Sequence, residues 1–282
     1  MKRILVTGAR GFIGKDLVKR LKKDPEYSVE AIMHKDVELT DPIAVDKFFE
    51  DYGSFHTIIH CAVKGGRRNQ KDSAKIIYEN IAMFENLVRH QDKFELMISV
   101  GSGAEYNTRE DVRNASEAEV GFSIPPSYYG LSKYIINERI KELDKVINLR
   151  IFNVFGEDET DDRMIKHNVM QYIKKEPMHI HRDKFMSFFG IDDLYKVVDY
   201  VIQRHETLQY KDYNLTYGDK NTLYDICVLI NTLSDYKVDI EVQTGFLDLS
   251  YSGSNNRLHS LNIKFDGLRK SVERVYNIWK KE

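Results

Sequence analysis

Cysteine, proline and tryptophan are scarce in this sequence, and its positive and negative charges nearly cancel. The 282 residues include two cysteines, five prolines and one tryptophan, and the formal net charge at pH 7 is −2. Because Cys61 and Cys227 lie far apart in apolar segments, we expect free thiols in a reducing cytoplasm instead of a disulfide framework. A net charge so close to zero gives no electrostatic support for binding nucleic acid.

Long hydrophobic runs are also missing, although 42% of the residues are hydrophobic. No apolar segment reaches the ~18 residues that a membrane span needs, and the N-terminus enters a predicted strand directly. We therefore expect a cytoplasmic protein with neither a signal peptide nor a membrane contact. A chain of 282 residues can bury a sizeable core as one or two domains.

Strand-like and helix-like segments alternate along the first half of the chain. The predicted strands cover residues 3–7, 28–33, 57–61, 95–100 and 146–152, and the predicted helices cover 13–23, 43–51, 74–91 and 128–143. This alternation predicts an α/β fold, a Rossmann-type doubly wound parallel sheet.

The domain boundary follows from the place where this alternation becomes less regular. We assign residues 1–155 to a dinucleotide-binding Rossmann domain and 156–282 mainly to a smaller substrate-binding region, with about 186–204 returning to the Rossmann sheet. The final stretch, 266–281, reads as an amphipathic helix in which Trp279 has a packing role.

Three glycines follow the first predicted strand, at Gly8, Gly11 and Gly14. Gly8 permits a sharp exit from the strand, Gly11 lets backbone N–H groups approach a pyrophosphate, and Gly14 lets the next helix press against the sheet. The N-terminus of that helix then faces the phosphates with its partial positive charge. The pattern predicts a dinucleotide-binding turn.

Tyr129 and Lys133 lie four residues apart in a predicted helix, so they share one face. A nearby ammonium stabilises phenolate and brings the tyrosine pKa towards a useful range for general acid/base chemistry. Ser102 ends a predicted apolar strand, where its hydroxyl can bind a substrate oxygen. We predict that these three residues are catalytic.

With the glycine loop, the serine and Tyr-x-x-x-Lys in this order, the chain resembles the extended short-chain dehydrogenase/reductases, which include nucleotide-sugar epimerases, dehydratases and reductases. The segment 150–156, Arg-Ile-Phe-Asn-Val-Phe-Gly, is similar to the family's Arg-x-x-Asn-Val-Tyr-Gly. The resemblance covers nearly the whole chain. It implies a cofactor site at Gly8, Arg10, Gly11, Phe12, Ile13, Gly14, His34, Lys35, Glu38, Leu39, Cys61, Ala62, Asn80 and Lys133.

The choice of nicotinamide cofactor depends on the end of the second strand. His34 and Lys35 stand there, and with Arg10 they could face the 2′-phosphate of NADP(H), which we favour. Asp36 is the argument for NAD(H), because a shift of one residue would place its carboxylate near the adenosine ribose.

Departures from the family narrow the predicted chemistry. Gly103 and Ala104 follow Ser102 where 4,6-dehydratases carry Asp-Glu, and Ala104 and Arg163 stand where fucose synthases have their acid/base cysteine and histidine. What remains is NADPH-dependent reduction of a nucleotide-linked 4-keto sugar with Tyr129 as general acid. The alternatives are an NAD-dependent 4-epimerase and a non-catalytic cofactor-binding regulatory protein.

Substrate contacts are implied by motif position. The resemblance assigns them to Tyr106, Asn153 and Arg257, the last because an arginine can bind diphosphate oxygens bidentately. It also implies a homodimer. We expect no metal site, because His179 and His181 have no third ligand spaced nearby.

Overall fold

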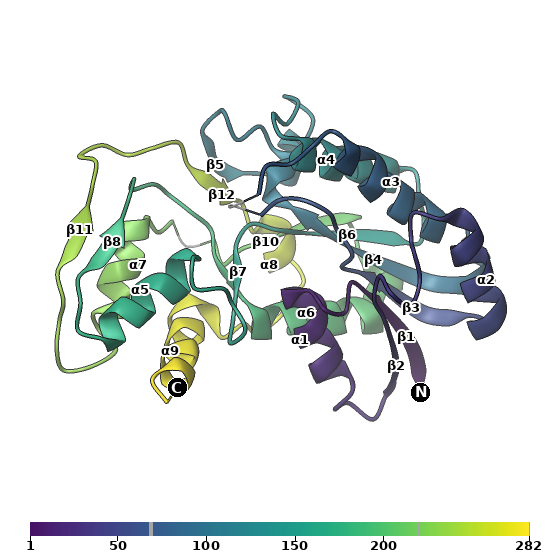
Figure 1. The fold of residues 1–282 in the computed structure, drawn as a ribbon, viewed down its shortest axis with the longest axis horizontal. Helices are drawn as coiled ribbons and strands as arrows, with labels where there is room; N and C mark the ends of the chain where they lie inside the picture. The colour runs from purple at the N-terminus through teal and green to yellow at the C-terminus, as the bar shows by residue number, and fades with distance from the viewer. Residues whose placement is uncertain (68–69, 219, 282) are drawn as a thin grey trace. The chain divides into compact units, whose positions relative to one another are not determined.

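A parallel sheet of six strands, ordered β2-β1-β3-β4-β6-β10, forms the centre of the computed structural model (Figure 1). Figure 1 shows α1 on one face of this sheet and α3 and α4 side by side on the other. The predicted doubly wound parallel sheet is therefore confirmed. Its strands are β1 (Lys2–Thr7), β2 (Tyr27–Ile32), β3 (Phe55–His60), β4 (Phe94–Ser102), β6 (Val146–Ile151) and β10 (Asp212–Leu215).

The chain order reverses between β1 and β3. β1 pairs in parallel with β2 on one side and with β3 on the other, and β3 pairs in parallel with β4. In open α/β sheets, ligands bind outside the carboxyl ends of the strands at such a reversal. The loops that follow Thr7 and His60 therefore border the expected ligand crevice.

The helices around the sheet begin at recognisable signals. Asp41 accepts a hydrogen bond from the Ile43 amide at the start of one helix, and Ser127 accepts one from the Gly130 amide at the start of another. Three of these helices share one apolar core with the sheet, to which Phe48, Phe84 and Ile136 contribute. The helices are α1 (Phe12–Leu21), α2 (Pro42–Tyr52), α3 (Lys75–Val88), α4 (Tyr128–Lys141) and α6 (Ile191–Arg204).

The structure describes residues 1–67, 70–218 and 220–281, and the chain divides into two units that interleave in sequence. Unit 1 comprises Met1–Asn107, Glu119–Arg150 and Val198–Tyr213, and unit 2 comprises Thr108–Ala118, Ile151–Val197 and Asn214–Glu282.

Unit 2 contains three pairs of short parallel strands: β5 (Val112–Ala115) with β12 (Tyr251–Gly253), β7 (Val154–Phe155) with β9 (Phe189–Gly190), and β8 (Met178–Ile180) with β11 (Ile240–Val242). Its helices are α5 (Met164–Ile173), α7 (Leu223–Ile230), α8 (Asn256–His259) and α9 (Gly267–Trp279).

Trp279 belongs to the apolar core of unit 2. It is 1% exposed and its indole N–H donates to the Glu157 carbonyl at 3.0 Å, so the expected packing role is confirmed.

The segment 186–204 differs from its prediction. Its strand, β9, pairs with β7 in a two-stranded sheet, and the sixth strand of the large sheet is β10. Only the second half of α6, from Val198, groups with unit 1. Two residues of β9 are too few to specify a partner by pattern, so tertiary contacts decide the pairing.

Candidate active site

Two positions around the loop after β1, Gly8 and Gly14, have room for glycine only. Gly8 has a φ of +65°, and a Cβ there would lie 2.6 Å from the Ala62 backbone nitrogen. A Cβ at Gly14 would lie 2.4 Å from the Gly8 carbonyl oxygen. The loop therefore presses directly on the chain that leaves β3, and helix α1 presses on the loop.

Helix α1 begins at Phe12 with its first amide groups available to a ligand. Its N-cap is Gly11, which has no side chain that could accept a hydrogen bond from these amides. The Gly11 N–H itself donates to the Gly8 carbonyl at 2.9 Å. The first N–H groups of a helix have no partner within the helix and carry partial positive charge. The predicted residues Phe12 and Ile13 thus start a site that fits the pyrophosphate of a dinucleotide.

The acidic groups after β2 are engaged within their own turn. Asp36 accepts a hydrogen bond from the Met33 amide at 2.9 Å, and the imidazole of His34 lies 3.0 Å from Glu38. Arg10 and Lys35, in contrast, form no ion pair with any residue that the structure describes. Two cations without an ion pair among the described residues are therefore left among the residues predicted to surround the adenosine end of the cofactor.

Two of the predicted cofactor residues, Leu39 and Asn80, are buried in unit 1. Leu39 is 6% exposed and belongs to the apolar core of unit 1. The Asn80 amide accepts from the Lys64 N–H at 2.8 Å, and donates to the Lys64 carbonyl and to Ser132. Asn80 thus fastens the segment after β3 to helix α4.

Strand β3 ends at the buried residue His60, and Cys61 follows it. His60 hydrogen-bonds Thr7 at 2.9 Å across β1 and β3, and burial lowers the pKa of His60 to about 3, assisted by the positive charge of Lys133. Burial also raises the pKa of the neighbouring Cys61 thiol to about 12. The Cys61 thiol, which is partly exposed, is therefore protonated at neutral pH.

Helix α4 carries Tyr129 and Lys133 on one face. The Lys133 side chain is 4% exposed, and its ammonium donates to the Val100 carbonyl in β4 at 2.7 Å. Burial lowers the pKa of Lys133 to about 8, against the opposing effect of the Glu105 carboxylate. A Cβ at Gly66 would lie 3.0 Å from the Tyr129 ring, so the ring lies against the loop that follows β3.

Ser102 lies at the end of β4 and begins the short 3₁₀ turn η2 (Gly103–Glu105). Its hydroxyl oxygen accepts from the Ala104 amide at 3.1 Å, which leaves the hydroxyl proton to be donated elsewhere. A Cβ at Gly130 would lie 2.3 Å from the Ala104 carbonyl oxygen. The turn that begins at Ser102 and the first turn of α4 are therefore packed together.

Glu105 is a residue of this site that the sequence analysis missed. Its carboxylate accepts from the Ser102 backbone amide at 2.8 Å and from the Arg150 guanidinium at 2.6 Å, and both charged side chains are fully buried. Arg150 also donates to Asn137, one helical turn after Lys133. The network joins the serine turn, helix α4 and strand β6. The Ser-x-x-Glu spacing, a capping-box pattern, is the sequence signal that could have revealed it.

The predicted substrate residues are distributed over both units. Tyr106 is in unit 1, 5% exposed, with the Arg150 guanidinium 5.5 Å from its ring centroid. Asn153 is in unit 2, where its amide donates to the Ser187 carbonyl at 2.9 Å. Arg257 is also in unit 2, with its Nε 3.8 Å from the buried carboxylate of Glu117.

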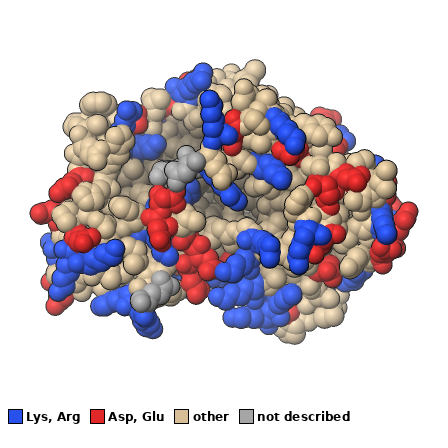
Figure 2. Space-filling model, in the orientation of Figure 1, with Lys and Arg blue, Asp and Glu red and all other residues tan. Residues whose placement is uncertain are grey.

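The described residues contain no helix long and apolar enough to cross a membrane. They also contain no group of three or more histidine, cysteine, aspartate or glutamate side chains that could hold a metal ion. On the face seen in Figure 2, basic and acidic side chains are interspersed.

Comparison with known proteins places this geometry in a family. The chain is 27% identical over 266 residues to ADP-L-glycero-D-manno-heptose-6-epimerase of Cupriavidus pinatubonensis, covering 82% of this chain and 78% of that protein. It is 24% identical over 252 residues to GDP-6-deoxy-D-talose 4-dehydrogenase of Aggregatibacter actinomycetemcomitans, covering 85% and 82% of the two chains.

A solved structure with the same fold is GDP-mannoheptose C4 reductase from Campylobacter jejuni with NADP bound. It aligns with a TM-score of 0.85 at 17% identity, covering 100% of this chain and 98% of that one. The family model described as "NAD dependent epimerase/dehydratase family" matches residues 4–216. The chain with this glycine loop and this helix α4 therefore belongs to the NAD dependent epimerase/dehydratase family.

Proposed function

We propose that this protein reduces a nucleotide-linked 4-keto sugar with NADPH. The observation that carries the proposal is Lys133, a buried lysine held by the Val100 carbonyl on the same helical face as Tyr129. A buried ammonium with few partners is costly unless it acts on a neighbouring charge. Here that charge is the phenolate that Tyr129 becomes when it gives up its proton.

Each residue of the site has a separate task in the proposed reaction. The Ser102 hydroxyl donates a hydrogen bond to the substrate carbonyl oxygen and keeps its proton. Tyr129 transfers its phenol proton to that oxygen as negative charge develops on it. Lys133 stabilises the tyrosinate that remains. The nicotinamide cofactor, when bound, supplies the hydride that the carbonyl carbon accepts. Fixed positions of these groups supply most of the rate enhancement.

Support for NADPH comes from the turn after β2. Asp36, which would favour NADH, accepts a hydrogen bond from its own turn, whereas Arg10 and Lys35 have no ion pair among the described residues. An adenosine 2′-phosphate provides the missing negative charge. The expected homodimer and cytoplasmic location stay predictions.

A 4-epimerase is the second candidate, because an epimerase is among the relatives. It would use the same three residues, but it would have to retain its cofactor while the sugar of the 4-keto intermediate rotates to present its other face. The experiment that separates the two is mass spectrometry of nucleotide released from the purified protein, with matched titrations of NADPH and NADH. Exchangeable cofactor with preference for NADPH supports the reductase, and retained NAD supports the epimerase.

Turnover is then measured with a panel of 4-keto-6-deoxy nucleotide sugars. Removing the general acid in a Tyr129→Phe variant should lower kcat by about 10²- to 10⁴-fold. Tyr128→Phe, one residue earlier on an exposed position of the same helix, is the matched control and should keep kcat. If neither cofactor binds, both enzyme proposals are wrong. If a cofactor binds but no sugar in the panel is converted, the non-catalytic cofactor-binding alternative is favoured.

A further inference from the structure

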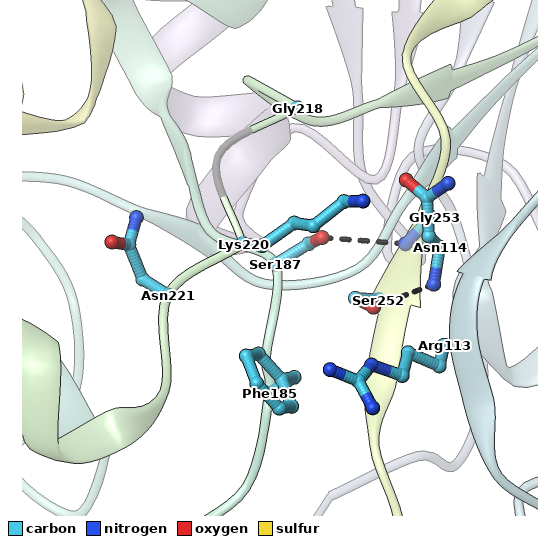
Figure 3. A pocket seen from close by; sticks show the side chains of 9 residues that line it. All are labelled: Arg113, Asn114, Phe185, Ser187, Gly218, Lys220, Asn221, Ser252 and Gly253. Carbon is cyan, nitrogen blue, oxygen red and sulfur yellow. Dashed lines mark hydrogen bonds between the residues drawn. The ribbon is translucent and has the colours of Figure 1, made fainter.

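In each unit, a planar group covers one face of an aromatic ring. In unit 2 the Arg113 guanidinium lies beside the Phe185 ring in the wall of a cavity (Figure 3), with its carbon 4.2 Å from the ring centroid. In unit 1 the covering group is a stretch of main chain at Gly66, and the ring is that of Tyr129. The second case concerns the residue to which we assign the proton transfer.

The main chain at Gly66 packs directly on the Tyr129 ring. A Cβ at Gly66 would lie 3.0 Å from Cε2, 3.1 Å from Cδ2 and 3.1 Å from Cγ of that ring. Nearly equal distances to three consecutive ring atoms place this position over the face of the ring and away from its hydroxyl group. Because carbon atoms in contact lie about 3.5–4.0 Å apart, the space over this face does not admit even a methyl group.

The turn that carries Gly66 is supported from behind. Gly65 and Gly66 have φ angles of +78° and +74°, a conformation that favours glycine. The Gly66 N–H donates to the Asp72 carboxylate at 3.1 Å, and a Cβ at Gly65 would lie 2.4 Å from the Ile76 side chain of helix α3. These contacts oppose any movement of the turn away from the ring.

The main chain of Tyr129 is anchored to the same segment. The buried Asn80 amide binds both the N–H and the carbonyl of Lys64, two residues before the glycine turn ends. Asn80 also donates to the Ser132 hydroxyl at 2.9 Å, and that hydroxyl donates to the Tyr129 carbonyl at 2.7 Å. The turn that covers the ring and the main chain that carries the ring are therefore held by one hydrogen-bond network.

We propose that the Gly66 main chain is a positioning element for Tyr129, which covers one face of the ring and holds the phenol in reach of the Lys133 ammonium. The inference rests on the proposed function in one respect, the role of Tyr129 as general acid. A phenol beside an ammonium ionises more readily than one that has moved away. A displacement of ~1 Å at a reacting group can lower its rate by about 10²-fold.

The Gly66→Ala variant tests the proposal, and Gly53→Ala is its matched control. Gly53 also belongs to unit 1 and has a similar φ of +71°, but a Cβ there meets nothing within 4 Å. Both variants therefore carry the cost of a side chain at positive φ. Only Gly66→Ala adds a collision with the Tyr129 ring, so a difference between the two variants reports on that contact.

The first measurement needs no substrate. The ultraviolet absorbance of tyrosinate is followed against pH in the full chain, and the titration of the Tyr129→Phe protein is subtracted so that Tyr129 alone remains. In Gly66→Ala, treated in the same way with its own Tyr129→Phe version, the pH at which Tyr129 ionises should rise by about one unit, because the phenol moves away from Lys133. In Gly53→Ala it should stay as in the parent.

The second measurement is turnover of a 4-keto nucleotide sugar that the parent reduces. In Gly66→Ala, kcat should fall by about 10- to 100-fold, because the proton donor no longer meets the substrate oxygen. Gly53→Ala should keep the parental kcat, since its methyl group is remote from the ring.

A double-mutant cycle separates positioning from a general failure to fold. In a Tyr129→Ala background the ring is absent, so Gly66→Ala should lower the urea midpoint no more than Gly53→Ala does. With the ring present, Gly66→Ala should lower the midpoint further. If Gly66→Ala destabilises both backgrounds equally, or prevents folding in both, the ring is not the reason for glycine at this position and the proposal is wrong.

Two further results would overturn the proposal: unchanged ionisation of Tyr129 in Gly66→Ala, or a loss of kcat no larger than that in Gly53→Ala. The failure of the proposed function gives a different pattern. If the ionisation of Tyr129 shifts in Gly66→Ala but the parent reduces no 4-keto sugar, the positioning of the ring stands and the reaction is wrong.

Discussion

At the scale of single residues, Glu105 connects the turn that begins at Ser102 with Arg150, and through Arg150 with helix α4, which carries Tyr129 and Lys133. It binds the Ser102 amide and the Arg150 guanidinium inside unit 1, and Arg150 in turn binds Asn137 on helix α4. A buried ion pair of this kind stabilises little by itself, but removal of one partner leaves the other charge buried and unpaired.

The Glu105→Gln variant should therefore lower the free energy of unfolding by about 3 kcal/mol, the lower end of the range for breaking a buried pair, since Asp212 still faces Arg150. Urea unfolding at pH 7.5 measures this loss. Glu206→Gln, at an exposed position of unit 1, is the control and should change stability by less than about 0.5 kcal/mol. An equal effect in both variants would contradict the buried network.

His60 makes stability depend on pH. Burial lowers its pKa from 6.5 to about 3 in the folded protein, so below pH 6.5 the unfolded chain binds more protons than the folded one. The contribution of His60 to the free energy of unfolding is fully present above pH 6.5, and it is lost as the pH falls towards 3. Between pH 7.5 and pH 5 the loss from this residue should be about 2 kcal/mol.

Urea unfolding at these two pH values checks the sign. The His60→Gln variant cannot titrate and should lose about 2 kcal/mol less than the parent over the same interval. His259→Gln, at an exposed position of unit 2, is the control and should keep the parental dependence. If the His60 variant kept it as well, His60 would not be the group that titrates.

At the scale of elements, the contact between β1, its loop and α1 decides whether a dinucleotide can bind. The Gly14→Ala variant places a Cβ 2.4 Å from the Gly8 carbonyl oxygen, which is backbone and cannot rotate away. Helix α1 must shift, which should cost about 1–3 kcal/mol of stability. Because the shift moves the amide groups of Phe12 and Ile13, affinity for NADPH should fall as well.

Thermal unfolding and NADPH titration measure the two effects. Gly245→Ala is the control, because a Cβ there meets nothing within 4 Å and the residue does not have a positive φ. It should match the parent in both measurements. Unchanged NADPH affinity in Gly14→Ala would show that the loop after β1 does not hold the cofactor.

At the scale of the whole molecule, the chain passes between unit 1 and unit 2 five times. Neither unit is a continuous segment, so neither can complete its own core before the other segments are in place. We expect one cooperative unfolding transition. Trp279 fluorescence, which reports on the core of unit 2, and far-ultraviolet circular dichroism, which reports on both units, should give the same midpoint in urea. Two separate midpoints would show independent units.

Much of the fold and part of the site could be read from local patterns. The alternating strands and helices predicted a parallel sheet and five of its six strands, because hydrophobic periodicity reports the local structure of each segment; β10 was not among the predicted strands. The pair Tyr129 and Lys133 could be placed on one face because helical spacing is fixed. The glycines after β1 could be recognised because a sharp turn and close backbone contacts within a few residues leave no room for a side chain at Gly8 and Gly14.

The tertiary structure alone decided which distant groups meet. Glu105 and Arg150 are 45 residues apart, and no local pattern states that their charges neutralise each other. The same holds for Arg257, which lies beside Glu117, and for Arg113, whose guanidinium lies over the Phe185 ring. The sequence by itself determined five strands of the sheet, the glycine loop and the Tyr-Lys pair, since their causes are local. The partners of buried charges were decided by packing between segments, since burial and Coulomb energy depend on positions in space.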